Sequence, residues 1–168
     1  KNYAGTLMSE SNKSVVDIQS SYTKVTQIPW GISESGFFSF DIQNNYQYKA
    51  FGVPGLGLKR GLSKDMVISP YSTFMALVIN YAKSMKNLRL MLNKGFNGLY
   101  GLYEAIDFTT SRVPYNKEYS LVKSYIAHHQ GMSLISLSNV LKNNIMQKRF
   151  HQEPRIRTVE ILLQEQVP

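Results

Sequence analysis

The spacing of apolar residues predicts a mainly helical protein. Apolar positions recur every three or four residues in five segments, whereas the strict alternation typical of a strand is scarce. The predicted helices span residues 11–25, 69–79, 85–94, 119–141 and 154–163. The fold class is therefore mainly α, with long loops between the helices.

Two of these helices carry end signals. Ser69 followed by Pro70 fits an N-cap residue and the first helical position. That helix is apolar on nearly all sides, which predicts that it is buried. Gly95 fits the end of the helix over 85–94, and Gly131 marks a kink or a close-packing point in the long helix over 119–141.

The segment 28–62 follows neither the helical nor the strand period. It holds the chain's only tryptophan, Trp30, and six of its eleven glycines, and its aromatic residues alternate with Ser, Gln and Asn. Aromatic faces stack on pyranose rings, and amide groups hydrogen-bond sugar hydroxyls. The composition favours a sugar-binding cleft over a core, and Glu34 lies in this segment between two serines.

A second loop, 98–113, repeats this chemistry. Tyrosine and phenylalanine residues accompany Glu104 and Asp107 in an otherwise apolar setting. Two aromatic-rich loops, each with a carboxylate, suit glycoside chemistry, because one carboxyl protonates the leaving oxygen while the other attacks or activates a nucleophile.

Both carboxylate assignments have structural alternatives. Glu34 could lie in the first turn of a helix capped by Ser33, where a carboxylate interacts favourably with the helix dipole. Glu104 and Asp107 are three residues apart, so on a helix they would share a face, and one could form an ion pair with Arg112. Asp107 is otherwise a candidate ligand for a sugar hydroxyl.

Composition and charge narrow the function classes. The 168 residues carry a net charge of +8 and contain no cysteine, which excludes disulfides, thiolate zinc sites and cysteine nucleophiles. The basic residues are scattered, which indicates a solvated surface and not a nucleic-acid site. No apolar run reaches the roughly 18 residues of a membrane span. The first residues lack an initiator Met and a signal-peptide pattern, so we expect the chain to begin inside a longer protein.

The run His128-His129-Gln130 suggests metal binding at first sight. Adjacent residues on a helix point about 100° apart, so we expect no metal here. Instead, one histidine packs or hydrogen-bonds inside the protein, while the other reaches substrate hydroxyls together with Gln130; a purely structural histidine is the alternative.

The glycines of 52–61 match neither the phosphate-loop nor the dinucleotide pattern, so no cofactor is expected. They are expected to shape a loop that brings Lys59 and Arg60 near the cleft, where Arg60 would bind a carboxylate or a hydroxyl. A surface position for Arg60 is the alternative.

Five separate stretches of the sequence resemble those of a known family. They are PWGISES (29–35), YQYKAFGVPGLGLKRGL (46–62), YEAIDFTTSR (103–112), AHHQGMSL (127–134) and MQKRFHQEPRIRTVEILLQEQVP (146–168). In this order they resemble the glycoamylase-like domain of cyclic β-1,2-glucan synthases.

The resemblance implies an (α/α)6 barrel. Six helical hairpins need more than about 200 residues, so residues 1–168 would be a single fragment, the C-terminal part of that domain, with the upstream part absent. Exposed helix faces would then contact other domains of the same synthase or a second copy of the fragment. The full synthases are membrane proteins with this domain on the cytoplasmic side of the bacterial inner membrane.

The resemblance also implies the activity, which is transglycosylation that closes linear β-1,2-glucan into rings. The alternatives are a β-glucan hydrolase and a non-catalytic glucan-binding or scaffold module. The implied catalytic pair is Glu34 as acid/base and Glu104 as nucleophile. The expected substrate-binding residues are Trp30, Tyr48, Arg60, Tyr103, Asp107, His128, His129 and Gln130.

Overall fold

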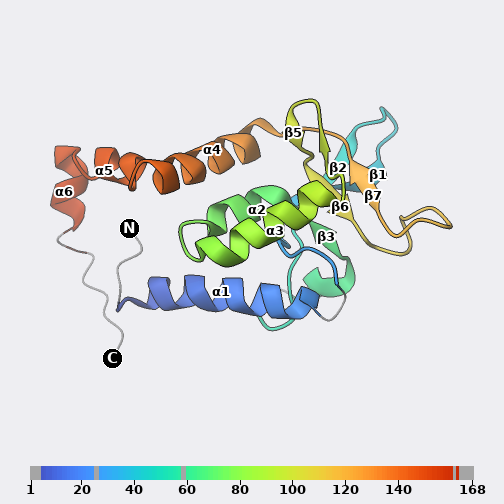
Figure 1. Cartoon of the computed structure of the whole chain (residues 1–168), viewed down its shortest axis with the longest axis horizontal. Helices are drawn as coiled ribbons and strands as arrows, with labels where there is room; N and C mark the ends of the chain where they lie inside the picture. The colour runs from blue at the N-terminus through green and yellow to red at the C-terminus, as the bar shows by residue number, and fades with distance from the viewer. Residues whose placement is uncertain (1–4, 25–26, 58–59, 161, 163–168) are drawn as a thin grey trace.

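Six helices form most of the ordered structure in a computed structural model that describes residues 5–24, 27–57, 60–160 and 162. Within these residues the helices are α1 (Leu7–Lys24), α2 (Pro70–Ala76), α3 (Tyr81–Asn93), α4 (Ala127–Leu141), α5 (Ile145–Phe150) and α6 (Pro154–Glu160) (Figure 1). The mainly helical prediction is confirmed, and the (α/α)6 barrel stays a prediction. None of the described helices is long and apolar enough to cross a bilayer.

Short strands supplement the helices. An antiparallel hairpin joins β1 (Ser35–Phe40) to β2 (Tyr46–Lys49), and a smaller one joins β4 (Asn97–Gly98) to β5 (Gly101–Leu102). A three-stranded antiparallel sheet has the order β3 (Val67–Ile68), β6 (Ala105–Asp107), β7 (Ser120–Val122). A single 3₁₀ turn, Leu62–Lys64, precedes β3.

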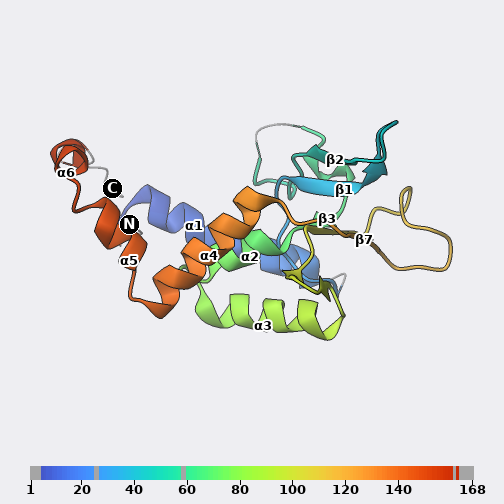
Figure 2. The ribbon, with the colours of Figure 1, turned by 90° about the horizontal axis from the view of Figure 1, so that it is seen from above.

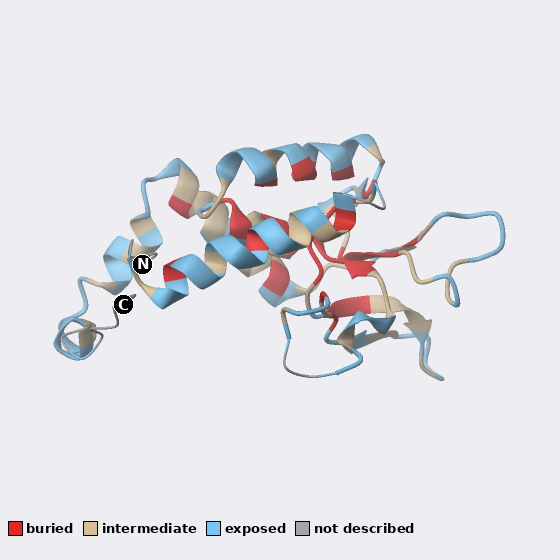
Figure 3. Ribbon diagram, turned by 90° about the horizontal axis from the view of Figure 1, so that it is seen from below, coloured by how far each residue is buried: buried red, intermediate tan, exposed pale blue. Residues whose placement is uncertain are grey.

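The elements are arranged around α2. Helices α3 and α4 both pack against α2, and α1 and α4 lie on opposite sides of the central pair (Figure 1). The strands gather at the end of the molecule opposite α5 and α6 (Figures 1 and 2). Buried residues concentrate on the central strands and on the helix faces that meet (Figure 3).

Most predicted helices are present with shifted ends. Helix α1 begins four residues before the predicted start at Ser11, and Val25 lies outside the described residues. Helix α3 begins at Tyr81, capped by Asn80, and Gly95 follows it with a positive φ of 73°. The last predicted helix is α6, which ends at Glu160; Ile161 and Leu163 lie outside the described residues.

The start of the second predicted helix is confirmed, and its burial is wrong. Ser69 is the N-cap residue and Pro70 the first helical residue, although the Ser69 hydroxyl makes no capping bond and donates to the Glu104 carbonyl instead, at 2.8 Å. The helix is not buried all round, because Met75 and Val78 are exposed.

The long helix predicted over 119–141 is wrong in its first third. Residues Ser120–Val122 form β7, which pairs with β6, and α4 begins only at Ala127. Ser120 and Val122 are buried while Leu121 between them is not, which is the alternation of a strand. Three residues are too few for this alternation to be recognised in the sequence. Gly131 lies within α4, which continues past it.

The core connects the sheet to α3. Its fully buried members are Val67, Ile68, Met91, Phe96, Ala105, Ile106 and Val122. Trp30 belongs to a second buried cluster with Val16 and Ala76, and it is only 8% exposed. The prediction that Trp30 stacks on a sugar is therefore wrong, because its ring is covered by the protein's own side chains.

The backbone at Trp30 is held by a buried asparagine of α3. The Trp30 N–H donates to Asn87 Oδ1 at 3.0 Å, and Asn87 Nδ2 donates to the Trp30 carbonyl at 2.7 Å and to Thr73 Oγ1 at 2.9 Å. The next residue, Gly31, has a φ of 130°, and a Cβ there would meet Ser72 Oγ at 2.8 Å. These constraints fix the path of the chain four residues before Glu34.

Replacing Asn87 by Ala should lower the free energy of unfolding by about 2 kcal/mol, because the buried Trp30 N–H loses its partner and the Trp30 carbonyl keeps only the Thr73 hydroxyl. The matched control is Asn93→Ala, at an exposed position of the same helix, which should cost less than about 0.5 kcal/mol. Urea unfolding of both variants measures the difference; equal effects would show that Asn87 does not hold this turn.

Candidate functional site

Two carboxylates accept hydrogen bonds from backbone N–H groups of β1. The Gly36 N–H donates to Glu104 Oε1 at 3.2 Å, and the Phe38 N–H donates to Asp107 Oδ2 at 3.0 Å. Glu104 directly precedes β6 and Asp107 ends it. Because Glu34 is adjacent to the first residue of β1, these bonds also set the position of Glu34.

Asp107 forms a buried ion pair. Its carboxylate is fully buried and accepts from Arg112 Nε at 2.7 Å, and from the Thr109 N–H at 2.9 Å. The Arg112 guanidinium also donates to Asp65 at 2.7 Å. The ion pair with Arg112 was the structural alternative for this residue. A sugar hydroxyl cannot reach this carboxylate, so the substrate-binding prediction for Asp107 is wrong.

Glu104 is bound to His129 of α4. His129 Nδ1 lies 2.9 Å from Glu104 Oε1 and 3.0 Å from Oε2, and both side chains are 1% exposed. The Tyr71 ring stacks on the imidazole at 3.7 Å and 9°, and the Tyr71 hydroxyl lies 2.7 Å from Ser33 Oγ. On the other side of the imidazole, His129 Nε2 lies 3.2 Å from the Tyr48 hydroxyl.

Glu34 is exposed at the edge of this cluster. One ligand atom each of Glu34, His128 and His129 lie within 4.8 Å of one another. The charge of Glu34 also acts on the Tyr48 hydroxyl, whose pKa it helps to raise. The two residues of the predicted catalytic pair, Glu34 and Glu104, therefore both lie beside His129.

The geometric argument against a metal at the two histidines is not supported. Their ring centroids are only 4.1 Å apart, closer than a separation of 100° on a helix suggests. In the part of the chain that the structure describes, Glu34, His128 and His129 are the residues that could hold a cation. His129 would have only Nε2 for it, because Nδ1 faces Glu104.

Burial dominates the electrostatics of the cluster. It raises the pKa of Glu104 from its ordinary value of 4.5, and the hydrogen bond from His129 offsets only part of this effect. Burial and then the charge of Glu34 raise the pKa of Tyr48 to about 12. The pKa of Tyr71 is also raised by burial. Both hydroxyls therefore keep their protons at neutral pH.

A cavity of about 200 Å³ adjoins Glu104 and His129. Its walls come from α2, α4 and the β4–β5 hairpin, and they include Tyr71, Tyr100, Tyr103 and Gln130. A larger hollow of about 600 Å³ lies between β2 and the loop before β7, but neither Glu34 nor Glu104 lines it.

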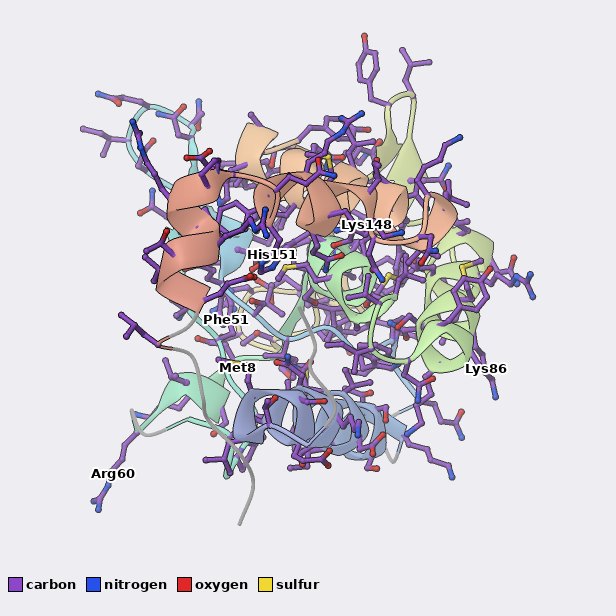
Figure 4. All side chains as sticks on the ribbon, turned by 90° about the vertical axis from the view of Figure 1, so that its left-hand side faces the viewer. Met8, Phe51, Arg60, Lys86, Lys148 and His151 are labelled. Carbon is purple, nitrogen blue, oxygen red and sulfur yellow. The ribbon has the colours of Figure 1, made fainter. Side chains whose placement is uncertain are left out.

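The structure brings together most, but not all, of the predicted site residues. Tyr48, His128 and His129 meet the two glutamates, and Tyr103 and Gln130 line the cavity. Arg60 is exposed and points outward at the edge of the molecule (Figure 4), so the prediction that it lies near the cleft is wrong. Lys59 lies outside the described residues.

The helical alternatives for the two glutamates are also wrong. Glu34 leads into a strand, and Glu104 leads into β6.

Tyr71 and Ser33 were missed by the sequence analysis. Tyr71 is the one residue of α2 that combines a ring with a hydroxyl, and it follows Pro70 directly. That signal was available, but nothing in the local spacing links Tyr71 to His129. Ser33 was considered only as a helix cap.

The family model described as "Putative glucoamylase" matches residues 4–154. The cyclic beta-(1,2)-glucan synthase NdvB of Rhizobium meliloti (strain 1021) is 40% identical over 164 residues. The match covers 98% of this chain and 6% of that synthase.

Two solved structures share the fold at low identity. A putative glucoamylase from Bacteroides fragilis NCTC 9343 superposes with a TM-score of 0.59 at 19% identity, covering 86% of this chain and 32% of that one. An endo-beta-1,2-glucanase from Chitinophaga pinensis, solved with sophorotriose and glucose, gives a TM-score of 0.54 at 20% identity, covering 84% of this chain and 31% of that one.

This chain spans about a third of the length of the two solved structures. The family model covers most of the chain, and the identity to the synthase extends over nearly all of it. The chain belongs to the glycoamylase family, as the resemblance predicted.

Proposed function

We propose that this domain transfers glycosyl units within β-1,2-glucan and closes linear chains into rings, as part of a cyclic β-1,2-glucan synthase. The identity to such a synthase supports the substrate. The fold shared with an endo-beta-1,2-glucanase supports glycoside chemistry on this linkage.

One observation carries the proposal: two carboxylates in opposite environments meet at one histidine. Glu34 is exposed and lies beside His129, whereas Glu104 is buried and binds the Nδ1 atom of the same ring. Glycosidases need one carboxyl that holds a proton and another that is ionised, and different environments provide this difference.

The geometry supports Glu34 as the acid/base. It is the carboxylate that a glycosidic oxygen can reach, with Tyr48 and His128 next to it to contact sugar hydroxyls. The role of nucleophile, which the resemblance implies for Glu104, requires an ionised oxygen at the sugar's anomeric carbon. Burial of Glu104 favours its neutral form.

The cavity and the exposed tyrosines fit a bound glucan. Tyr48 is 43% exposed and Tyr100 is 77% exposed, so each presents a ring face or edge to a sugar. Tyr103 and Gln130 add a half-buried ring and an amide beside the cavity. Transfer to a sugar hydroxyl requires that water be excluded, and apolar tyrosine rings help to exclude it.

Other parts of a synthase are the proposed protein partners. Helices α4 and α5 expose Leu134, Leu141 and Phe150, which would be buried by another domain or by a second copy. A place on the cytoplasmic side of the bacterial inner membrane follows from the proposed synthase.

Glu34→Gln should lower glucan turnover more than about 100-fold, and Glu104→Gln should also lower it at steady state. The substrate is linear β-1,2-glucan, and products are identified by mass. The variants are made in this chain and in the same chain extended to a whole glycoamylase-like domain. The control is Glu118→Gln, an exposed glutamate outside the site, which should leave turnover unchanged.

The products separate the alternatives. Cyclic or redistributed glucans establish transfer, and shortened reducing oligosaccharides establish a hydrolase. If the glucan binds and nothing changes in the extended chain, the domain is a binding module and the catalytic proposal is wrong.

The raised pKa of Glu104 also predicts a pH dependence of stability. Because the folded-state pKa lies above 4.5, the unfolded chain releases this proton first, and the free energy of unfolding falls as pH rises from below 4.5 through the folded pKa. Glu104→Gln cannot titrate. Relative to this variant, the natural chain should therefore lose stability between acid and neutral pH, as measured by urea unfolding. A gain over this range would show that the pKa is lowered instead.

A further inference from the structure

A glutamate and two histidines place three metal-ligand atoms close together at the candidate site. One atom each of Glu34, His128 and His129 lie within 4.8 Å of one another. The histidines belong to the first turn of α4, and Glu34 directly precedes β1. Two imidazoles and one carboxylate are a ligand set that zinc takes in proteins, with a fourth position left for water or another small ligand.

The buried histidine is already arranged as a metal ligand. His129 Nδ1 lies 2.9 Å from Glu104 Oε1, and both side chains are 1% exposed. A histidine that binds a metal through one ring nitrogen commonly donates its other N–H to a carboxylate, which fixes the tautomer and the direction of the ring. With the proton on Nδ1, Nε2 keeps the lone pair that a metal needs.

Stacking also limits how this imidazole can turn. The Tyr71 and His129 rings are 3.7 Å apart at an angle of 9°, and the Tyr71 hydroxyl lies 2.7 Å from Ser33 Oγ. The direction of Nε2 is therefore set by groups that are not themselves candidate ligands. A ligand that is held in place before the metal arrives loses little freedom when the metal binds.

The other two ligands are exposed and can adjust to a metal. Zinc lies about 2.0–2.2 Å from nitrogen and oxygen ligands, so the ligand atoms of a tetrahedral site are roughly 3.5 Å apart. A separation of 4.8 Å exceeds this value by about 1 Å. Because Glu34 and His128 are exposed, rotation of their side chains can close the difference while α4 and β1 stay in place.

One present contact of His129 has to give way. The Tyr48 hydroxyl lies 3.2 Å from Nε2, the atom that would bind the metal. Tyr48 is 43% exposed, so its hydroxyl can move into solvent when the metal takes its place.

We infer that Glu34, His128 and His129 Nε2 bind a divalent transition-metal ion such as Zn²⁺, and that the bound ion inhibits the domain. Imidazole nitrogen suits such ions, whereas Mg²⁺ and Ca²⁺ prefer oxygen ligands. The metal site does not depend on the activity, but the inhibition rests on the proposed function, in which Glu34 is the acid/base. A carboxylate bound to zinc can neither protonate a leaving oxygen nor accept the proton of an incoming hydroxyl.

Zinc binding to this 168-residue chain tests the site without requiring turnover. Calorimetric titration with ZnCl₂ near neutral pH should show one site with a Kd of about 10 µM or less, and MgCl₂ should show no binding. Glu34→Gln and His128→Ala should each weaken zinc binding at least about tenfold. Both positions are exposed, so these variants should fold.

The matched control is His151→Ala, which removes the chain's third histidine, at the end of α5, and should leave the zinc affinity unchanged. The site is overturned if zinc shows no saturable binding, or if neither Glu34→Gln nor His128→Ala weakens it. An equal loss in His151→Ala would mean that zinc binds exposed histidines without a built site, and it would also overturn the inference.

Nitrogen NMR of the histidine rings identifies the atom that binds. Zinc should shift the Nε2 resonance of His129 and leave Nδ1 protonated, because Nδ1 stays on Glu104. A zinc-bound Nδ1, or a His129 ring that zinc does not affect, would contradict the proposed ligand set.

Turnover separates the metal site from the proposed function. In the chain extended to a whole glycoamylase-like domain, ZnCl₂ should inhibit glucan turnover and a chelator should restore it. More linear glucan should raise the zinc concentration needed for half-inhibition, since both ligands require Glu34.

The failures of the two proposals differ. Zinc that binds the three ligands while Glu34→Gln stays active would keep the metal site and refute the proposed function. No zinc binding, together with an inactive Glu34→Gln enzyme, would do the reverse. Zinc bound without inhibition of an enzyme that needs Glu34 would overturn the inhibitory role.

Discussion

The position of β1 depends on two buried carboxylates. Glu104 and Asp107 accept the backbone N–H groups of Gly36 and Phe38, where an ordinary sheet would offer carbonyls. Burying a carboxylate is costly unless it is paired and hydrogen-bonded. Asp107 is paired with Arg112 and Glu104 with His129, so each backbone bond depends on a cationic or donating side chain farther along the chain.

The Asp107–Arg112 and Glu104–His129 pairs both hold β1, but they differ in their chemistry. Arg112 keeps its charge at any pH that the protein meets, so Asp107 has a permanently charged partner. Glu104 has an imidazole as its partner instead, and burial raises the pKa of Glu104. The pair at Glu104 can therefore change its protonation state while it continues to hold β1. This difference is why Glu104 takes part in the proposed chemistry and Asp107 does not.

Local patterns predicted what depends on neighbours in sequence. The helices predicted over 11–25 and 85–94, Pro70 at a helix start and the ion pair of Asp107 with Arg112, five residues away, all depend on short spacings, and only the helix ends were misplaced. Trp30 and β7 were misjudged because their partners are remote: Asn87 and Thr73 hold Trp30, and β6 pairs with Ser120–Val122. The meeting of Glu34, Glu104 and His129 could be expected only from the family resemblance, since no spacing brings 34, 104 and 129 together.

The exposure of Glu34 suits a carboxyl that acts first as an acid and then as a base. After Glu34 has given its proton to the leaving oxygen in the proposed reaction, the hydroxyl of the incoming sugar returns a proton to it as that hydroxyl attacks. A sugar hydroxyl can do this in place of water only if water is kept from the reacting centre. The tyrosine rings that line the cavity beside Glu104 and His129 help to exclude water there. Under this constraint, an exposed acid/base and an aromatic cavity wall belong to the same proposed chemistry.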